Sequence, residues 1–436
     1  MNSKLSIFNS FHSIWGWTDS TTNIEYAIVG LREGTVFLDI STPTSPINLG
    51  ALEGHNSKSS VDRDIKTYGN YAYIVADVPD HGLQIFDLTQ LRSVSNPPVS
   101  FQETAHFEIN FQGSRLNEET EIDFSRYYEK LGGIVGASPL RSASDEGYAH
   151  NIAINEESGY AYLVGSNNCN GGLYMLDLSN PLSPSAKGCF GDLGWISDAQ
   201  CVTYDGPDST YSNREICFVS YSIGVGVLDV TNKSNPQLLS AIEDANFNSV
   251  SQGWLTEDQS YFLVGDRNNG GKLHTYVVDV SNLDNISVEY TYTTSIVALD
   301  GNNFVKGNYL YQASHRAGLR ILDLSEISDG VLDEVGYFDT TPNLSNSGND
   351  GVRGVYPYFS SGVVMISSIE EGLMILRQRE VTNMPSLSPS LAFALNGTEE
   401  ICKDNIAGIY PCMNINLHGF LDSDQLSGSE NNTLNE

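Results

Sequence analysis

The chain has no hydrophobic run long enough to cross a membrane as a helix, which takes roughly 18 apolar residues or more. Its N-terminal segment has neither the apolar core nor the cleavage site of a secretory signal peptide. Basic residues are scarce as well: 22 Lys and Arg stand against 54 Asp and Glu, so the net charge is −32. A surface this acidic would be repelled by nucleic acid phosphates and by anionic membranes, so we expect neither as a partner.

The motifs of several enzyme classes are missing too. There is no Gly-x-Ser-x-Gly elbow of a serine hydrolase, no glycine-rich phosphate loop and no Cys-x-x-Cys-His haem site. No Cys-x-x-Cys pair indicates a zinc site, and no compact Asp/Asn-rich loop resembles an EF-hand. We therefore assign no catalytic residue. The acidic composition serves solubility, and it also leaves room for a bound divalent cation such as Ca²⁺.

The six cysteines fall into three neighbouring pairs, which predicts three local disulfides and an oxidising compartment, either extracellular or at the cell surface. The predicted pairs are Cys169–Cys189, Cys201–Cys217 and Cys402–Cys412. Such a location conflicts with the missing signal peptide. We therefore expect the chain to be a fragment of a longer precursor or to be exported through another signal.

One phrase recurs seven times along the chain. It comprises an apolar strand, a turn that usually bears Gly, a second apolar strand ending in Asp, and a Ser- or Pro-containing stop, as in YAYLVGSNNCNGGLYMLDLSNPLSPS; the last copy is worn and has Arg377 in place of the Asp. The copies begin at Glu25, Tyr71, Tyr160, Ile216, Tyr261, Tyr309 and Gly362. A period of roughly 40–50 residues with several short strands in each unit is typical of propeller blades. The sequence therefore predicts an all-β, seven-bladed β-propeller, with the aspartates closing turns by accepting backbone N–H groups.

The propeller is expected to span residues 13–380, with a partly helical insertion at 103–147 between the second and third blades. Residues 381–400 read as a linker and 421–436 as a disordered tail. Between them, residues 401–420 form a disulfide-bearing extension. This extension is either a latch strand that closes the ring or the start of a further copy. The N-terminal KLSIFNSF segment is the competing closing strand.

Polar and aromatic side chains gather near the predicted start of each blade's inner strand. We expect them to converge on one mouth of the central channel, where they would bind a polar ligand or a cation, or else satisfy one another. The set comprises Trp15, Trp17, Arg63, Asp64, His150, Asn151, Asp198, Gln200, Gln252, Trp254, Asp300, Asn302 and Arg353. The two N-terminal indoles are expected near the ring axis, where they would pack or stack on a ligand.

Several long motifs resemble a known family. They are HNIAINEESGYAYLVGSNNCNGGLYMLDLSNPLSP, DAQCVTYDGPDSTYSNREICF, SQGWLTEDQSYFLVGD and GNYLYQASHRAGLRILDLS. These motifs are similar, in order, to the LVIVD-repeat, "choice-of-anchor B" proteins, from about Ser13 to Glu380. The resemblance implies a secreted or surface-anchored bacterial propeller and implies no particular reaction.

Two features depart from that family's pattern. Its members carry a Cys-containing AG-x-YPC segment ahead of the first strand, whereas here CKDNIAGIYPCMNINL lies near the C-terminus, as expected of a permuted chain or a piece of a tandem array. They also carry three histidines where this chain has Ser197, Ser251 and Gly301. Only His150 remains, with His81 in a separate turn, so a histidine cluster at the channel mouth would be lost.

Two functions remain open. The first is an extracellular binding, adhesion or interaction module whose partner is a protein, a polysaccharide or a small polar ligand, acting as a monomer or within a tandem-domain protein. The alternative is a lactonase-like, metal-assisted hydrolase. Its ligand set would be Asp198, Asp300, Asn302 and His150, and the missing histidines count against it.

Overall fold

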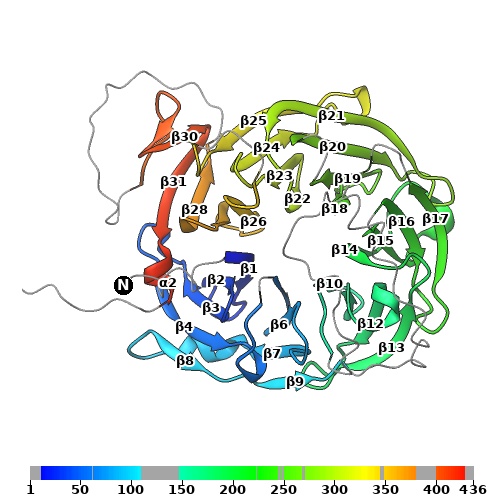
Figure 1. The fold of residues 1–436 in the computed structure, drawn as a ribbon, viewed down its shortest axis with the longest axis horizontal. Helices are drawn as coiled ribbons and strands as arrows, with labels where there is room; N and C mark the ends of the chain where they lie inside the picture. The colour runs from blue at the N-terminus through cyan, green and yellow to red at the C-terminus, as the bar shows by residue number, and fades with distance from the viewer. Residues whose placement is uncertain are drawn as a thin grey trace, which may run out of the picture.

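Seven mainly antiparallel sheets stand around one axis as the blades of a β-propeller, which confirms the predicted fold (Figure 1). The computed structural model describes residues 11–60, 62–109, 147–221, 223–243, 247, 250–267, 271–343, 348–379 and 399–427. Most of the predicted insertion, including its expected helix, and nearly all of the predicted linker lie outside these residues. The described part of the chain is almost entirely β-structure.

Each blade has four main strands, which follow one another in sequence from the hub to the outer edge of the ring. Blade 1 contains β1 (Phe11–Thr18), β2 (Glu25–Leu31), β3 (Gly34–Asp39), β4 (Ile47–Glu53) and, parallel to β4, β8 (Val99–Phe101). Blade 2 contains β5 (Arg63–Tyr68), β6 (Tyr71–Ala76), β7 (Leu83–Asp87) and β9 (Ala105–Phe107). Blade 3 contains β10 (Asn151–Asn155), β11 (Tyr160–Val164), β12 (Leu173–Asp177) and β13 (Ser185–Phe190). Blade 4 contains β14 (Ile196–Thr203), β15 (Glu215–Tyr221), β16 (Gly224–Asp229) and β17 (Gln237–Glu243).

The remaining blades follow the same plan, and the C-terminal segment adds strands to two of them. Blade 5 contains β18 (Val250–Leu255), β19 (Tyr261–Asp266), β20 (Lys272–Asp279) and β21 (Ser287–Val297). Blade 6 contains β22 (Asn303–Lys306), β23 (Tyr309–Ala313), β24 (Leu319–Asp323), β25 (Asp333–Phe338), β29 (Ile406–Ala407) and β30 (Tyr410–Met413). Blade 7 contains β26 (Val352–Tyr356), β27 (Val363–Ser368), β28 (Gly372–Gln378) and β31 (Ile415–Leu421). Short helices are η1 (His55–Ser57), η2 (Leu88–Ser93), η3 (Cys169–Gly171), η4 (Ser209–Tyr211), η5 (Ile327–Asp329) and α2 (Ser423–Ser427).

The aspartate that ends the third strand has one role in six blades. Its carboxylate accepts the backbone N–H of the residue two positions further on, as the sequence predicted. The acceptor and donor pairs, all at 2.8–3.0 Å, are Asp39 and Ser41, Asp87 and Thr89, Asp177 and Ser179, Asp229 and Thr231, Asp279 and Ser281, and Asp323 and Ser325. The carboxylate turns the chain away from the third strand, so the repeated aspartate specifies the blade and not a ligand site.

Replacing one of these acceptors should weaken its blade. Asp279→Ala should lower the free energy of unfolding by about 1–2 kcal/mol, because a charge-assisted hydrogen bond to the backbone is lost. Urea unfolding measures the difference. Asp279→Asn keeps an acceptor oxygen and is the matched control, so it should lose clearly less; equal losses in the two variants would contradict the hydrogen-bond explanation.

The ring closes through side-chain packing together with a strand from the C-terminal segment. β1 packs against β26 and β27, and the Glu25 carboxylate accepts hydrogen bonds from the Ser361 backbone N–H at 3.0 Å and its hydroxyl at 2.6 Å. β31 is the outer strand of blade 7, β30 pairs with the edge of blade 6, and Asn48 in blade 1 donates a hydrogen bond to the Gln425 carbonyl. The C-terminal segment therefore clamps blades 6, 7 and 1 together, as Figure 1 shows.

Two predicted boundaries are wrong. The segment assigned to the insertion from residue 103 still contains β9, which completes blade 2 by pairing with β7. The tail assigned as disordered from residue 421 begins with the last residue of β31 and continues into α2, where Leu426 is buried. In both places a short segment pairs with or packs against a blade, a contact that local composition does not reveal.

All three predicted disulfides are present: Cys169–Cys189, Cys201–Cys217 and Cys402–Cys412. The first lies within blade 3, and the second joins the paired strands β14 and β15. The third lies within the C-terminal segment 399–427, called the C-terminal clamp below, and joins Cys402 to Cys412 in β30. Disulfides that each span one local loop are typical of proteins that fold in an oxidising compartment.

The clamp disulfide should stabilise ring closure. The Cys402→Ser/Cys412→Ser double variant should lose about 2–3 kcal/mol of stability by the loop-entropy estimate. Amides of β28 and β31 should also exchange hydrogen faster, as measured by hydrogen-exchange mass spectrometry. Cys169→Ser/Cys189→Ser is the matched control and should speed exchange in blade 3 only. Unchanged exchange in β31 of the first variant would show that packing alone holds the clamp.

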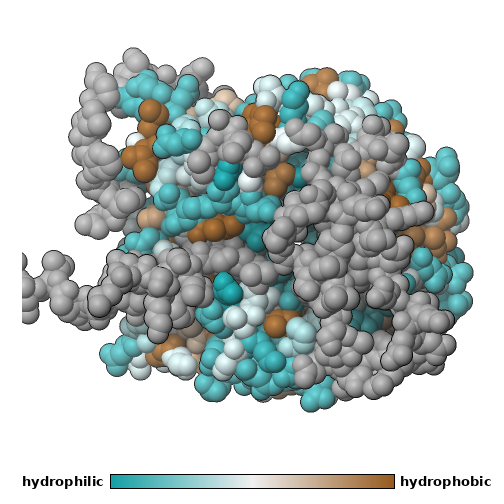
Figure 2. Space-filling model, viewed as in Figure 1, coloured by the Kyte–Doolittle hydropathy of each residue, from teal (hydrophilic) through white to brown (hydrophobic). Residues whose placement is uncertain are grey.

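The coloured residues on the face seen in Figure 2 are mainly hydrophilic, with hydrophobic ones scattered among them. Among the most exposed apolar side chains of the described residues are Ile401, Ile406 and Ile409 in the C-terminal clamp. Helices in the described part of the chain are too short to span a bilayer.

Candidate functional site

A belt of hydrogen bonds joins the inner strands around the hub. The Trp15 indole donates to the Thr67 hydroxyl (3.2 Å), the Ile152 N–H to Asp64 (3.3 Å), the Asn151 amide to Asp198 (2.5 Å), the Leu255 N–H to Gln200 (2.7 Å), the Asn303 N–H to Gln252 (3.1 Å) and the Lys306 ammonium to the Pro357 carbonyl (2.6 Å). Each bond crosses from one blade to the next. Many of the residues predicted at the channel mouth are therefore used in holding the blades together.

Aromatic rings from four blades meet at the hub. Trp15 on β1 lies 5.1 Å from Tyr356 on β26 and 5.8 Å from Phe304 on β22, and Trp254 on β18 lies 4.8 Å from Phe304, all measured between ring centroids. The Lys66 ammonium lies 4.5 Å above the Trp15 ring and 2.7 Å from Asp64. Trp15 and Trp254 are half-buried and pack against neighbouring rings, so both contribute to the contacts between blades at the hub.

Four other predicted residues are buried or half-buried. Arg63 is buried and donates hydrogen bonds to the Leu31 carbonyl, and it lies 2.9 Å from the His81 ring nitrogen. Trp17 is buried, stacks on Tyr26 and donates to the Gly69 carbonyl. Asp300 is fully buried beside Asn303, and Asn302 is half-buried next to it.

Burial changes the acidity of two predicted carboxyl groups. It raises the pKa of Asp198 to about 7, with the nearby Lys66 opposing and Asp64 reinforcing the shift. It raises the pKa of Asp300 to about 8, and the neighbouring Asp266 carboxylate also acts to raise it. Neither carboxyl group belongs to the set of His, Cys, Asp and Glu side chains that the described residues place at metal-binding spacing.

The pKa of Asp300 predicts a pH-dependent stability. Between pH 4 and 8 the folded carboxyl keeps a proton that the unfolded chain releases near pH 4, so its contribution to stability is full below about pH 4 and is lost as the pH rises toward 8. Asp300→Asn should remove this loss. The melting temperature of the variant minus that of the wild type should therefore increase from pH 4 to pH 8. Differential scanning fluorimetry across this range tests it, with the half-buried Asp279→Asn as control; parallel curves for wild type and Asp300→Asn would contradict it.

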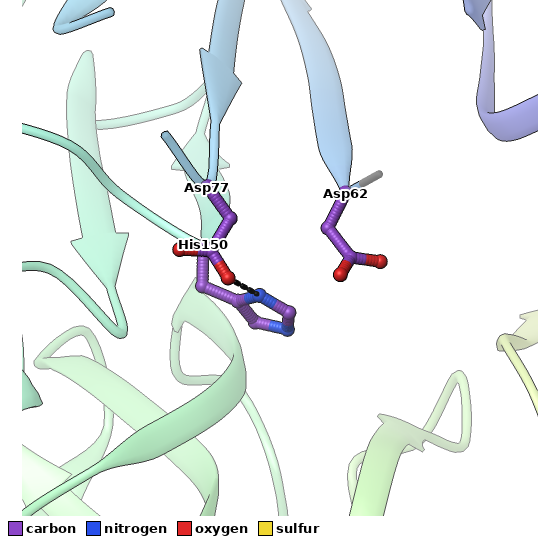
Figure 3. A group of neighbouring side chains, drawn as sticks. All are labelled: Asp62, Asp77 and His150. Atoms are coloured by element: carbon purple, nitrogen blue, oxygen red, sulfur yellow. Dashed lines mark ion pairs between the residues drawn. The ribbon is translucent and has the colours of Figure 1, made fainter. Parts of the chain in front are cut away.

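Two carboxylates and an imidazole lie close together at the edge of the channel mouth, which is called the rim below. Asp62 directly precedes β5, Asp77 directly follows β6, and His150 directly precedes β10 of the next blade. Their potential ligand atoms all lie within 4.8 Å of one another, and His150 Nδ1 lies 3.4 Å from Asp77 Oδ2 (Figure 3). Among the described residues, this is the group of His, Cys, Asp and Glu side chains with spacing suited to a metal ion.

The backbone and one glycine hold this group in place. The Asp77 N–H donates to the Asp62 carbonyl at 2.9 Å, and the His150 N–H donates to the Val164 carbonyl at 3.0 Å. The indole of Trp195 lies beside the imidazole, with ring centroids 5.7 Å apart. Gly165 has a φ of +58°, and a Cβ there would approach His150 Cβ to 2.6 Å, so this position excludes a side chain.

Arginine borders the carboxylates of the rim. Arg353 Nη2 lies 3.6 Å from Asp62 Oδ1. Burial lowers the pKa of Arg353, the Asp62 carboxylate opposes this shift, and the nearby Arg267 adds to it. Burial and the same two arginines lower the pKa of His315 to about 3, so this histidine is neutral at physiological pH. The mouth therefore presents carboxylates and guanidinium groups side by side.

Of the predicted ligand set, the structure places His150 in this group, while Asp198 and Asp300 belong to other contacts. The sequence analysis missed Asp62 and Asp77 because it selected Arg63 and Asp64, at the start of the inner strand, as site residues. The register of the β5–β6 hairpin pairs Arg63 with Ala76 and Tyr68 with Tyr71. The same symmetry places the two aspartates opposite each other at the open end, so hairpin register was the signal that could have found them.

The fold and the rim define a seven-bladed propeller with a polar, partly exposed channel mouth. The family model described as LVIVD repeat matches residues 25–52, 62–99, 146–192 and 303–340. These segments fall in blades 1, 2, 3 and 6, so the chain contains LVIVD repeats, as the sequence motifs indicated. None of the curated proteins compared with the chain matches it.

Solved structures with a similar fold are distant in sequence. Hydrazine synthase of Kuenenia stuttgartiensis is 12% identical, with a TM-score of 0.52, over 85% of this chain and 96% of that one. A protein from Lactobacillus plantarum is 12% identical, with a TM-score of 0.50, over 80% and 89%. The periplasmic gluconolactonase of Pseudomonas aeruginosa is 10% identical, with a TM-score of 0.47, over 74% and 84%. At such identities the likeness concerns the propeller fold, and no activity follows from it.

Proposed function

We propose that this protein is a non-catalytic binding module that works outside the cell and holds a small polar ligand at the channel mouth. The single observation that carries the proposal is the rim itself. There, Asp62, Asp77, His150 and Arg353 come from three blades and are partly exposed. Propellers commonly bind with the loops that their rigid strands position.

The expected ligand carries an anionic group. Arg353 offers a planar set of donors that matches a carboxylate or phosphate, and its side chain is 19% exposed. Arg267 adds positive charge nearby. Three disulfides and the acidic composition favour an extracellular or cell-surface location.

A ligand panel tests this proposal. Sugar acids and sugar phosphates should bind to the wild type more tightly than the corresponding neutral sugars, as measured by saturation-transfer NMR and calorimetry. Arg353→Gln should weaken the anionic ligands by at least about tenfold, because a charge-assisted hydrogen bond is lost.

Arg214→Gln is the matched control, because Arg214 also pairs with an aspartate, Asp229, but lies in the turn that precedes β15. This variant should bind like the wild type. Neutral sugars that bind as well as the acids, or equal binding by Arg353→Gln, would contradict the proposed site. Turnover of any panel member would contradict the non-catalytic assignment.

A further inference from the structure

The rim carries a donor set with the composition of a metal site. Asp62 and Asp77 supply carboxylate oxygens from the two ends of one hairpin, and His150 supplies an imidazole nitrogen from the next blade. Figure 3 shows Asp77 and His150 adjacent to each other, with the Asp62 carboxylate directed toward the same space. We propose that these three residues bind one Zn²⁺ ion.

The spacing agrees with this assignment. Zinc ligands lie about 2.0–2.2 Å from the ion, so tetrahedral neighbours are about 3.3–3.6 Å apart. Asp77 Oδ2 and His150 Nδ1, at 3.4 Å, already have this separation. The side chain of Asp62 is 35% exposed, whereas that of Asp77 is 7% exposed. Two residues are therefore already at ligand spacing, and binding would draw the Asp62 carboxylate toward the ion.

The donor types favour zinc over the calcium ion expected from composition. Calcium takes six to eight oxygen ligands and seldom a nitrogen, whereas zinc accepts imidazole with carboxylates. Three protein ligands leave a fourth position open. Arg353, 3.6 Å from Asp62, borders the site, so an anionic group could bind the metal and the guanidinium together. This last role rests on the proposed function, whereas the metal site does not.

Calorimetry on metal-depleted, tag-free protein tests the site. One Zn²⁺ should bind per chain, and Ca²⁺ should bind far more weakly. Loss of a partner that only orients a ligand weakens metal binding 10–100-fold, so His150→Ala and Asp62→Asn should each weaken Zn²⁺ by more than about 100-fold. Asp62 is partly exposed, and melting curves should show that this variant folds.

Two control variants separate this site from other groups. Asp80→Asn removes an exposed carboxylate three residues from Asp77 and should leave zinc affinity unchanged. His55→Ala disrupts the other histidine group of blades 1 and 2, where the His55 ring stacks on His106 and contacts Glu103. It should also leave the tight site intact. Wild-type affinity in His150→Ala, or loss of the site in His55→Ala, overturns the assignment.

Crystals soaked in zinc locate the ion directly. An anomalous peak within about 2.3 Å of a His150 nitrogen and an Asp77 oxygen supports the site, and a peak only elsewhere overturns it. Sugar-phosphate binding is then measured with and without Zn²⁺. Binding at least tenfold tighter with zinc supports the shared role. Equal binding in both conditions, with normal zinc titration, overturns that role and leaves the proposed function and the metal site standing.

Discussion

The structure depends on the hydrogen bonds that cross from each blade to the next at the hub. A blade presents polar backbone and side-chain groups where the inner strands crowd together, and burying those groups without partners would be strongly unfavourable. Side chains such as Gln200 and Gln252 solve this by accepting a backbone N–H of the neighbouring inner strand. Each of these bonds has its donor and its acceptor on different blades, so the bonds couple neighbouring blades into a cooperative unit.

This requirement separates structural from functional polar residues. Groups on the inner strands, among them Asp64 and Asn151, are engaged by other blades and gain order from those contacts. Groups one residue outside the strands keep part of their surface exposed to solvent. Asp62 and His150 are of this kind, since each directly precedes an inner strand. A shift of one residue along the chain therefore moves a side chain from the belt to the rim.

The same shift explains what the sequence could and could not predict. The repeated Asp, the glycine turns and the spacing depend on local chemistry, so blade number, turn role and disulfide pairs could all be predicted. The candidate site depends on register to within one residue, which composition does not provide, so Arg63 was chosen where Asp62 lies at the rim. Ring closure by β31 and the ordered α2 depend on contacts with blade 1, hundreds of residues away in the sequence.

The net charge of the chain bears on how a rim that carries both carboxylates and arginines could bind an anionic ligand. At −32, the protein repels anions over most of its surface, and an anionic ligand could bind only where positive charge is concentrated. Arg353 and Arg267 provide such a place, but the carboxylates of Asp62 and Asp77 lie beside them and would repel the same ligand. A divalent cation held by those carboxylates would remove this repulsion, because its two positive charges balance theirs, and its open coordination position would accept the anion. Carboxylates and arginines at one mouth are thus compatible with an anionic ligand when a metal is bound.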